Sequence, residues 1–430
     1  MKRACIINIA GISPRLLQGI DGLWIQSLAG PPRPMEPTVP VVRDSVEASM
    51  TTGTAPGEHG VIGGGIFRRQ YHRLSLDERS NTLLNRKRFW HARDLGMHPK
   101  VAMLFWSQPL AGGADIVVGA GTYHLATEKV FSPPELQARL EQKIGSVPLE
   151  HFFGPRASVR AAEWVSQSAE EIWNQEQPDL LLAYLPGVDF ALQRYGHGSP
   201  EVREAIQQVD AYAQQVAELA GRDGADTFVV SDGGYVPVTR FTLPNVHLRR
   251  ADLLVTRESE HGTVIDYDRS RAFAMVDHQF AHVFCDDDKI AEAAESILAS
   301  DPAVERVITR DEAFCTGLGH DRAGERILLA APDAWFSYHW WEPGQEAPAG
   351  AEVLDSRAKC GYDPCELFPG TDGDRICPDP SQVRASRGRL PDDPPDWCVL
   401  ACSGPVEDAS PTVTDLPRLV LQSTAGVNRT

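Results

Sequence analysis

Four apolar runs in the chain have the length and composition of buried β-strands. They span residues 5–9, 101–106, 180–185 and 227–230, and the last two are followed closely by the carboxylates Asp189 and Asp232. Runs that are apolar throughout are typical of strands covered on both faces, as in parallel sheets. Because open α/β sheets place functional groups at the carboxyl ends of their strands, the pattern predicts that both carboxylates lie in a crevice at that edge.

Between these runs lie segments with the residue pattern of helices. Ser199 and Pro200 have the residue types of an N-cap and a first helical turn, and Gly221 marks the end of the segment. The apolar positions between them share one helical face; they are Val202, Ile206, Val209, Val216 and Leu219. The segment therefore predicts a long helix with one buried side, and a second helix is expected from Pro133 to Lys143.

The segment from Pro40 to Ile62 combines an apolar strand end, a polar turn at Arg43, a helix of about two turns and a Gly/Pro stop. The helix is expected to begin around Asp44 to Val46. A turn from strand to helix leaves backbone N–H groups unpaired at the positive end of the helix dipole. This arrangement favours an anion next to Arg43.

The same segment resembles the surroundings of the nucleophile in the type I phosphodiesterase/nucleotide pyrophosphatase branch of the alkaline phosphatase superfamily. That family has a proline, two small apolar residues, a nucleophilic Thr and a helix closing in T-G-x-x-P-x-x-H-G. The frame is present here, with Arg43 in place of the Thr. The resemblance implies an α/β fold with a doubly wound, mostly parallel sheet and helices on both faces, in one domain of residues 1–402.

Two regions are expected to depart from this core. Residues 107–165 are mixed and loop-rich, which predicts a lid or insertion over the site. Residues 403–430 are rich in Pro, Ser and Thr, and this composition predicts a flexible C-terminal tail.

The resemblance also assigns the positions that would hold two metal ions. They carry Ala10, Arg43, Asp189, Gln193, Asp232 and Gly233, and two later positions where histidines are expected carry Arg357 and Arg387. A two-metal phosphatase site needs several Asp and His ligands. Only the two carboxylates remain, so no cofactor is expected beyond, at most, one divalent ion held by Asp189, Asp232 and His278.

The arginines at these positions suggest a different kind of site. The guanidinium groups of Arg43, Arg357 and Arg387 would restore the lost positive charge and bind phosphate or carboxylate. Together with Asp189 and Asp232 they would form a mixed ionic site for acid–base chemistry, in which Arg43 and the two carboxylates are catalytic. For the two later arginines, an exposed and solvated position is an equally good interpretation.

Residues 270–284 are strand-like and carry His278 and His282 four positions apart. Positions i and i+4 of a strand share a face, so both side chains could reach one pocket. The preferred interpretation is that one histidine faces the site and the other packs in the core.

The composition of the chain argues against some classes of binding partner. The formal net charge of −18 argues against nucleic acid or an anionic membrane. No run approaches about eighteen apolar residues and the N-terminal stretch is too short for a secretion signal, which predicts a cytoplasmic protein. The eight cysteines include no C-x-x-C pair, so reduced, packed thiols are expected.

These observations favour a diverged phosphodiesterase/nucleotide-pyrophosphatase-like enzyme that acts on a phosphorylated or anionic small molecule in a specialised biosynthetic step. Its reaction would be of a lyase, isomerase, transferase or cyclase type, since no phospho-Thr can form. Two alternatives stay open: a non-catalytic binding protein on the same fold, and a one-metal phosphodiesterase with Ser45, Ser49 or Thr51 as nucleophile. The sequence carries no signal for the oligomeric state.

Overall fold

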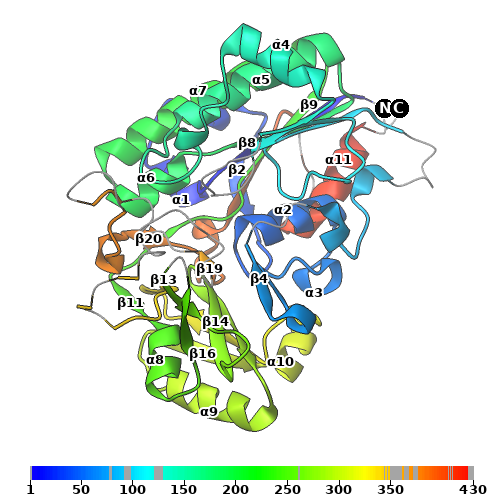
Figure 1. The fold of residues 1–430 in the computed structure, drawn as a ribbon. Coiled ribbons are helices and arrows are strands. Elements are labelled where there is room, and N and C mark those ends of the chain that lie inside the picture. Colours follow the sequence, from blue (N-terminus) through cyan, green and yellow to red (C-terminus); the bar gives the residue numbers. More distant parts are fainter. Residues whose placement is uncertain are drawn as a thin grey trace.

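An eight-stranded sheet runs through the larger part of the molecule in the order β2-β21-β9-β1-β8-β5-β6-β7 (Figure 1). Its strands are β1 (Ala4–Ile9), β2 (Gly30–Met35), β5 (Val101–Leu104), β6 (Ile116–Ala120), β7 (Lys129–Ser132), β8 (Leu180–Leu185), β9 (Asp226–Val230) and β21 (Cys398–Cys402). β1 pairs in parallel with β8 and β9, and β5 pairs in parallel with β8 and β6. β7 and β21 run antiparallel to their neighbours, so the sheet is mostly parallel, as predicted.

The protein is known from a computed structural model. The structure describes residues 2–76, 80–91, 98–120, 129–259, 262–342, 344–345, 347–348, 361–362, 368–370, 376–404, 406, 408 and 410–424. None of the described helices has the length and apolar character needed to cross a membrane.

Alternate residues of β1 are buried against different helices. Cys5 and Ile7 belong to one core with α5 (Arg160–Glu176) and α7 (Pro200–Arg222), whereas Ala4 and Ile6 belong to another with α2 (Arg43–Thr52) and α11 (Leu416–Thr424). Side chains of a strand point alternately to its two faces, so helices cover both faces of the sheet. The predicted doubly wound α/β fold is therefore confirmed.

The predicted helix after Ser199 is α7. The Ser199 side chain accepts a hydrogen bond from the backbone N–H of Val202, as an N-cap does. α2 begins at Arg43, directly after the extended Val42, and ends at Gly53, whose φ of 71° is left-handed. Arg43 thus occupies the first helical position, close to where the sequence predicts the helix to start.

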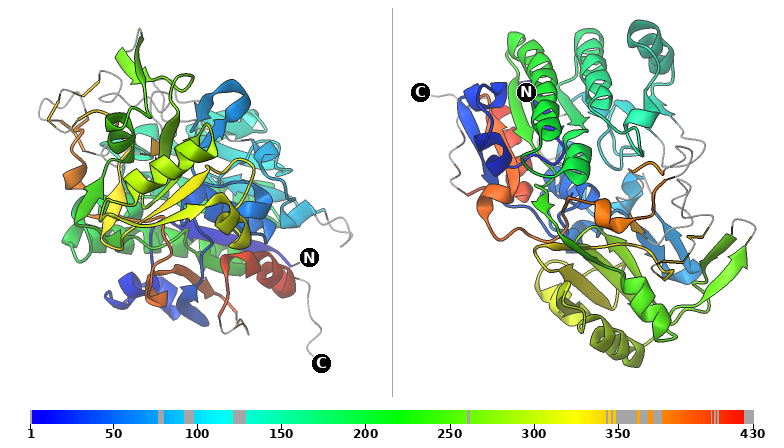
Figure 2. Two further views of the ribbon diagram at one scale, coloured as in Figure 1. Left: turned by 90° about the horizontal axis from the view of Figure 1, so that it is seen from below. Right: turned by 90° about the vertical axis from the view of Figure 1, so that its left-hand side faces the viewer.

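A second sheet of five strands, in the order β16-β17-β15-β14-β19, lies below the first in Figure 1 and in the right-hand view of Figure 2. Its strands are β14 (Ala272–Asp277), β15 (Phe280–Cys285), β16 (Val304–Thr309), β17 (Arg326–Ala330) and β19 (Gly361–Tyr362). α8 (Pro244–Arg250) and α9 (Asp288–Leu298) share a separate core with it. The sequence did not reveal this second sheet.

The remaining elements are short. They are α1 (Pro14–Gln18), α3 (Pro56–His59), α4 (Glu135–Ile144), α6 (Val188–Tyr195), α10 (Arg310–Cys315), β3 (Ile66–Arg68), β4 (Arg73–Ser75), β10 (Val236–Pro237), β11 (Arg240–Thr242), β12 (Thr256–Ser259), β13 (Gly262–Ile265), β18 (Ala334–Phe336) and β20 (Ala385–Ser386).

Residues 270–284 do not form one strand. β14 and β15 pair antiparallel around a two-residue turn made by His278 and Gln279, and His278 has a φ of 62°. The interpretation of His278 and His282 as neighbours on one strand face is therefore wrong. Neither turn residue is Gly, Asn or Asp, so the usual sequence signal of a tight hairpin is missing.

The two regions predicted to depart from the core belong to it in part. In residues 107–165, β6 and β7 extend the main sheet and α4 follows them. At the start of this region, Ser107 and Gln108 donate hydrogen bonds to Glu47 and Asp44 of α2. In the predicted tail, α11 buries Leu416 and Val420 against the main sheet. The prediction of a flexible tail is wrong for this helix, because its apolar positions follow the 3.6-residue period of a packed face.

Candidate functional site

The carboxyl ends of β1, β8, β9 and β5 meet at one edge of the main sheet, because these strands are parallel. Asp232 follows β9, and Asp189 lies in the first turn of α6, just after β8. Their carboxylates are electrostatic neighbours, and both are almost completely buried. Both carboxylates therefore lie at the carboxyl edge of the parallel strands.

Arg43 reaches the same edge from the first position of α2. Its guanidinium carbon lies 3.5 Å from the centre of the Tyr184 ring, a cation–π contact. Its Nε is 3.4 Å from Glu47 Oε1, and its Nη2 donates to the carbonyl oxygen of Phe105. The side chain is 21% exposed, so Arg43 is fixed in direction and still reached by solvent.

Glu47 supports Arg43 from one turn further along α2. Its fully buried carboxylate accepts hydrogen bonds from Asn8 Nδ2 at 2.8 Å and from the Ser107 N–H at 2.7 Å. Burial raises the pKa of Glu47, although Arg43 and Ser107 oppose the shift. For Arg43, burial acts to lower the pKa, but Glu47 and Tyr184 raise it on balance. The pair is held by interactions from three separate elements.

Arg387 and Asp232 form a buried ion pair. Arg387 Nη1 lies 2.7 Å from Asp232 Oδ2, and the two side chains are 7% and 0% exposed. The Gly11 N–H donates to Asp232 Oδ1 at 3.2 Å. Both oxygens of Asp232 therefore have partners within the protein. Arg387 is not the solvated surface residue of the alternative interpretation.

The Asp189 carboxylate is hydrogen-bonded within the turn at the start of α6. Its Oδ1 accepts a hydrogen bond from the Gly187 N–H at 2.9 Å, and the residue is 3% exposed. Burial raises the pKa of Asp189, and the nearby Asp232 raises it further, while Arg387 acts in the opposite direction. A buried carboxyl with a raised pKa can hold a proton at a pH where an exposed one cannot.

A metal pair, which the resemblance implies, does not fit these residues. Asp232 Oδ2 is taken by the Arg387 guanidinium. Gly233 stands where a histidine is expected, with a φ of 119°, and a Cβ there would lie 2.3 Å from Val41 Cγ1. A side chain at this position is therefore strained whatever its type. Among the described residues, no group of three His, Cys, Asp or Glu side chains is placed to hold a metal ion.

The two histidines of the β14–β15 hairpin differ in their surroundings. His282 Nδ1 accepts from the Gly324 N–H at 3.3 Å, and its Nε2 donates to the Ile62 carbonyl at 3.1 Å, so both ring nitrogens serve the fold. His278 packs edge-on against Tyr235, whose ring also lies 5.0 Å from the Arg387 guanidinium carbon. His278 thus lies beside Tyr235 and Arg387, whereas His282 packs in the core.

The hydroxyls proposed as alternative nucleophiles are buried and hydrogen-bonded. Ser45 Oγ donates to the Val61 carbonyl, and Thr51 Oγ1 donates to the Glu47 carbonyl. Ser49 Oγ lies 2.9 Å from His59 Nε2. His59 Nδ1 accepts the Val61 N–H, so in the neutral ring Nε2 carries the proton and donates it to Ser49. His59 therefore cannot act as the base for Ser49.

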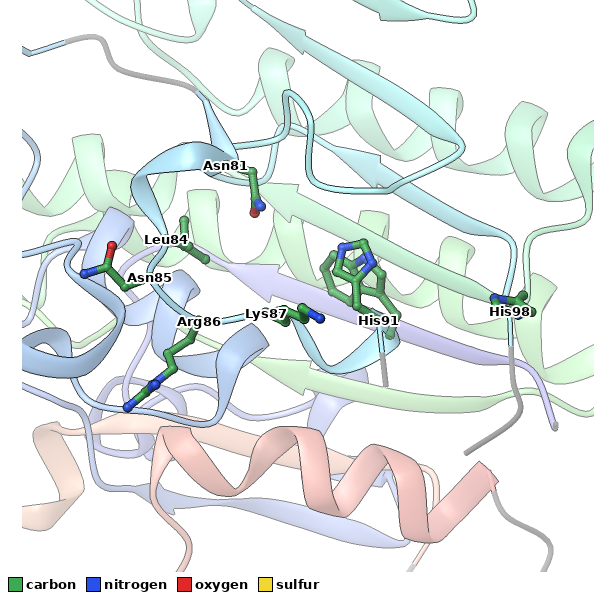
Figure 3. A pocket seen from close by; sticks show the side chains of 8 residues that line it. Asn81, Leu84, Asn85, Arg86, Lys87, His91 and His98 are labelled. Carbon is green, nitrogen blue, oxygen red and sulfur yellow. The ribbon is translucent and has the colours of Figure 1, made fainter. Parts of the chain in front are cut away.

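A cavity of about 480 Å³ is lined by other residues (Figure 3). They are Asn81, Leu84, Asn85, Arg86, Lys87, Trp90, His91 and His98. None of the predicted site residues is among them, so this cavity does not define the site. Arg357, the remaining predicted anion contact, lies outside the described residues.

Sequence reasoning missed the residues that position the predicted ones. Glu47 and Tyr184 hold Arg43, and the turn at Gly388 brings Arg387 against the β14–β15 hairpin. Gly388 has a φ of 127°, and a Cβ there would lie 2.9 Å from the backbone nitrogen of Gln279. The i, i+4 spacing of Arg43 and Glu47 was the one local signal available.

The model of the type I phosphodiesterase/nucleotide pyrophosphatase family matches residues 7–363, and the chain belongs to this family. Similar solved structures include phosphonoacetate hydrolase from Sinorhizobium meliloti 1021 in complex with phosphonoformate, at 16% identity and a TM-score of 0.66 over 98% of this chain and 96% of that one. Murine ectonucleotide pyrophosphatase/phosphodiesterase 5 in complex with AMP matches at 13% identity and a TM-score of 0.61, over 99% and 95%. At such identities the likeness shows the fold. No curated protein sequence matches the chain.

Proposed function

We propose that the protein binds a phosphorylated or otherwise anionic small molecule in the crevice around Arg43 and acts on it by Asp/Arg acid–base chemistry. The observation that carries the proposal is the buried Arg387–Asp232 pair, in which a guanidinium occupies a carboxylate that the family resemblance assigns to a metal. The family membership and the phosphonoformate and AMP complexes of similar structures support this ligand class.

In this proposal Arg43 is the direct contact to the anion. Its partly exposed guanidinium lies at the amino end of a ten-residue helix, where unpaired N–H groups add positive potential. Glu47 and the Tyr184 ring hold its direction, so little side-chain entropy is lost on binding.

Asp189 is the proposed proton donor or acceptor, since burial favours its protonated form. Asp232 stays paired with Arg387 and fixes the position of that guanidinium beside the ligand. No phospho-enzyme intermediate is involved, because the nucleophile position carries Arg43 and the nearby hydroxyls are buried.

The proposal is tested by calorimetric titration with inorganic phosphate and with AMP. Replacing Arg43 by Ala removes a charge-assisted contact worth about 1.5–3 kcal/mol and is expected to weaken binding roughly tenfold to a hundredfold. Arg43→Lys keeps the positive charge but loses the planar guanidinium, so its affinity for both ligands should lie between those of the wild-type and Arg43→Ala proteins. The fold should survive, because Glu47 keeps its hydrogen bonds from Asn8 and Ser107.

The matched control is Arg418→Ala on α11, an exposed arginine paired with Asp408 and Asp415. It should bind both probes as the unchanged protein does. Equal affinity of the Arg43→Ala and wild-type proteins would contradict the proposed site. Turnover of a bound ligand that survives Asp189→Asn would contradict the proton-transfer role.

A further inference from the structure

Two carboxylates, one from a helix and one from a strand, face one glycine beside the Arg43 site. Asp44 follows Arg43 in the first turn of α2, and Asp277 ends β14. A Cβ added at Gly64 would lie 3.1 Å from Asp277 Oδ2 and 3.8 Å from Asp44 Oδ2, so the two oxygens are at most about 7 Å apart. The Gly64 N–H donates to Asp277 Oδ2 at 2.7 Å. Acidic groups thus gather next to the arginines.

Gln108 adds a buried acceptor to this pair. Its Nε2 donates to Asp44 Oδ1 at 3.3 Å, and the residue is 4% exposed. Its Oε1 is buried, and within the part of the chain that the structure describes no group donates a hydrogen bond to it. An unpaired buried acceptor is costly, so this oxygen favours a donor supplied from outside the protein.

The acidic pair and the arginines are close enough to interact electrostatically. Asp44 is an electrostatic neighbour of both Arg43 and Asp277, and Arg387 is a neighbour of Asp277. His278 Nε2 lies 4.0 Å from Asp277 Oδ1 on the side of the hairpin turn. Guanidinium donors therefore lie next to a separate set of carboxylate and amide acceptors, formed by Asp44, Asp277 and Gln108.

Building on the proposed function, we propose that the ligand is a zwitterion, with a phosphate or carboxylate at Arg43 and Arg387 and a primary ammonium group at Asp44, Asp277 and Gln108. An ammonium has three donors, no acceptor and a positive charge, which matches the three acceptor side chains. The opposed charges of the crevice fix the direction of such a ligand. A ligand with only an anionic end would supply no donor to Gln108 Oε1 and no positive charge between Asp44 and Asp277.

The test compares two probes of similar length, 2-aminoethyl phosphate and propyl phosphate, by calorimetric titration at one pH. The wild-type protein is expected to bind the amine about tenfold or more tightly, as one charge-assisted hydrogen bond allows. Asp277→Asn and Asp44→Asn should each remove most of this preference and leave propyl phosphate binding unchanged or slightly tighter. Asp321→Asn, at a 95% exposed side chain, is the control and should keep the preference.

The outcomes separate this inference from the proposed function. Equal binding of both probes, with Arg43→Ala weakening both, overturns the zwitterion and leaves the anion site standing. Failure of both probes to bind overturns the two proposals together. A preference for the amine that survives both Asp variants also overturns the inference. If one Asp variant does not fold, the other gives the same readout.

Discussion

At the scale of residues, the charge of the candidate site comes from a few side chains, only some of which could be predicted from the sequence. Arg43, Asp189, Asp232 and Arg387 could be predicted, because strand ends and a motif frame fix their positions locally. Glu47, Tyr184 and Gln108 could not, since they come from separate elements and their roles arise only when these pack together. The sequence thus locates the charged groups, and the packing decides which of them pair.

His59 shows how a residue of the motif serves stability. It is fully buried between Val61 and Ser49, and burial, with help from nearby cations, lowers its pKa from 6.5 to about 3. Below pH 6.5, His59 is therefore protonated in the unfolded chain but stays neutral in the folded protein until the pH approaches 3. The contribution of His59 to the free energy of unfolding is therefore fully present above pH 6.5 and is lost progressively as the pH falls toward 3.

We therefore predict that the free energy of unfolding depends less on pH when His59 is replaced by Asn, which still offers an acceptor to the Val61 N–H. His59 should account for a loss of roughly 3 kcal/mol between pH 7 and pH 4 in the wild-type protein. Urea unfolding at several pH values measures this. His282, whose pKa burial lowers to about 4, is present in both proteins and cancels in the comparison. Identical pH profiles would contradict the account.

At the scale of elements, long periodic segments were predictable and short ones were not. α7 has a cap, a buried face and a clear end, all visible in the sequence. The turn of the β14–β15 hairpin is formed by His278 and Gln279, neither of which is a typical turn residue, so the sequence predicts a single strand there. α11 was hidden by the Pro/Ser/Thr-rich composition around it. Tertiary contacts, rather than local propensity, decide these elements.

α11 allows a direct test of that conclusion. Leu416 is fully buried against the core shared by α2 and the main sheet, so Leu416→Ala should destabilise the protein by about 2–5 kcal/mol. Arg418→Ala, two residues further on the exposed side, removes only surface ion pairs and should cost less than about 1 kcal/mol. Guanidinium chloride unfolding of the two variants gives the comparison. Similar small losses would mean that α11 contributes little to the core.

At the scale of the molecule, the candidate site takes its residues from two sheets. The main sheet brings Asp189, Asp232 and the start of α2, and the second sheet brings the Asp277–His278 turn. The Arg387–Gly388 turn joins them, with the Arg387 carbonyl accepting from the Gln279 N–H at 2.6 Å. The first contribution follows from apolar runs in the sequence. For the second, the sequence indicates a strand in residues 270–284 but neither the hairpin nor the sheet to which it belongs.

The residues at the edge of the main sheet also bear on the metal content of the protein. At the positions that the family resemblance assigns to the metal site, Ala10, Gln193 and Gly233 supply no charged ligand and Arg43 and Arg387 carry positive charge. A metal ion would have to displace the Arg387 guanidinium from a fully buried carboxylate, leaving that guanidinium unpaired at a cost of several kcal/mol.

We predict that the protein, purified without chelator, holds well below two equivalents of divalent metal by elemental analysis, and that a chelator leaves its thermal unfolding unchanged. Restoring side chains is not expected to restore the metals. A protein with Arg43→Thr, Gln193→His, Gly233→His and Arg387→His regains ligand types, but the new histidine at 233 meets Val41 in a backbone conformation that favours glycine. Two tightly bound zinc ions in the unmodified protein would show that Arg387 leaves Asp232 readily, and the arginine-based site would then be wrong.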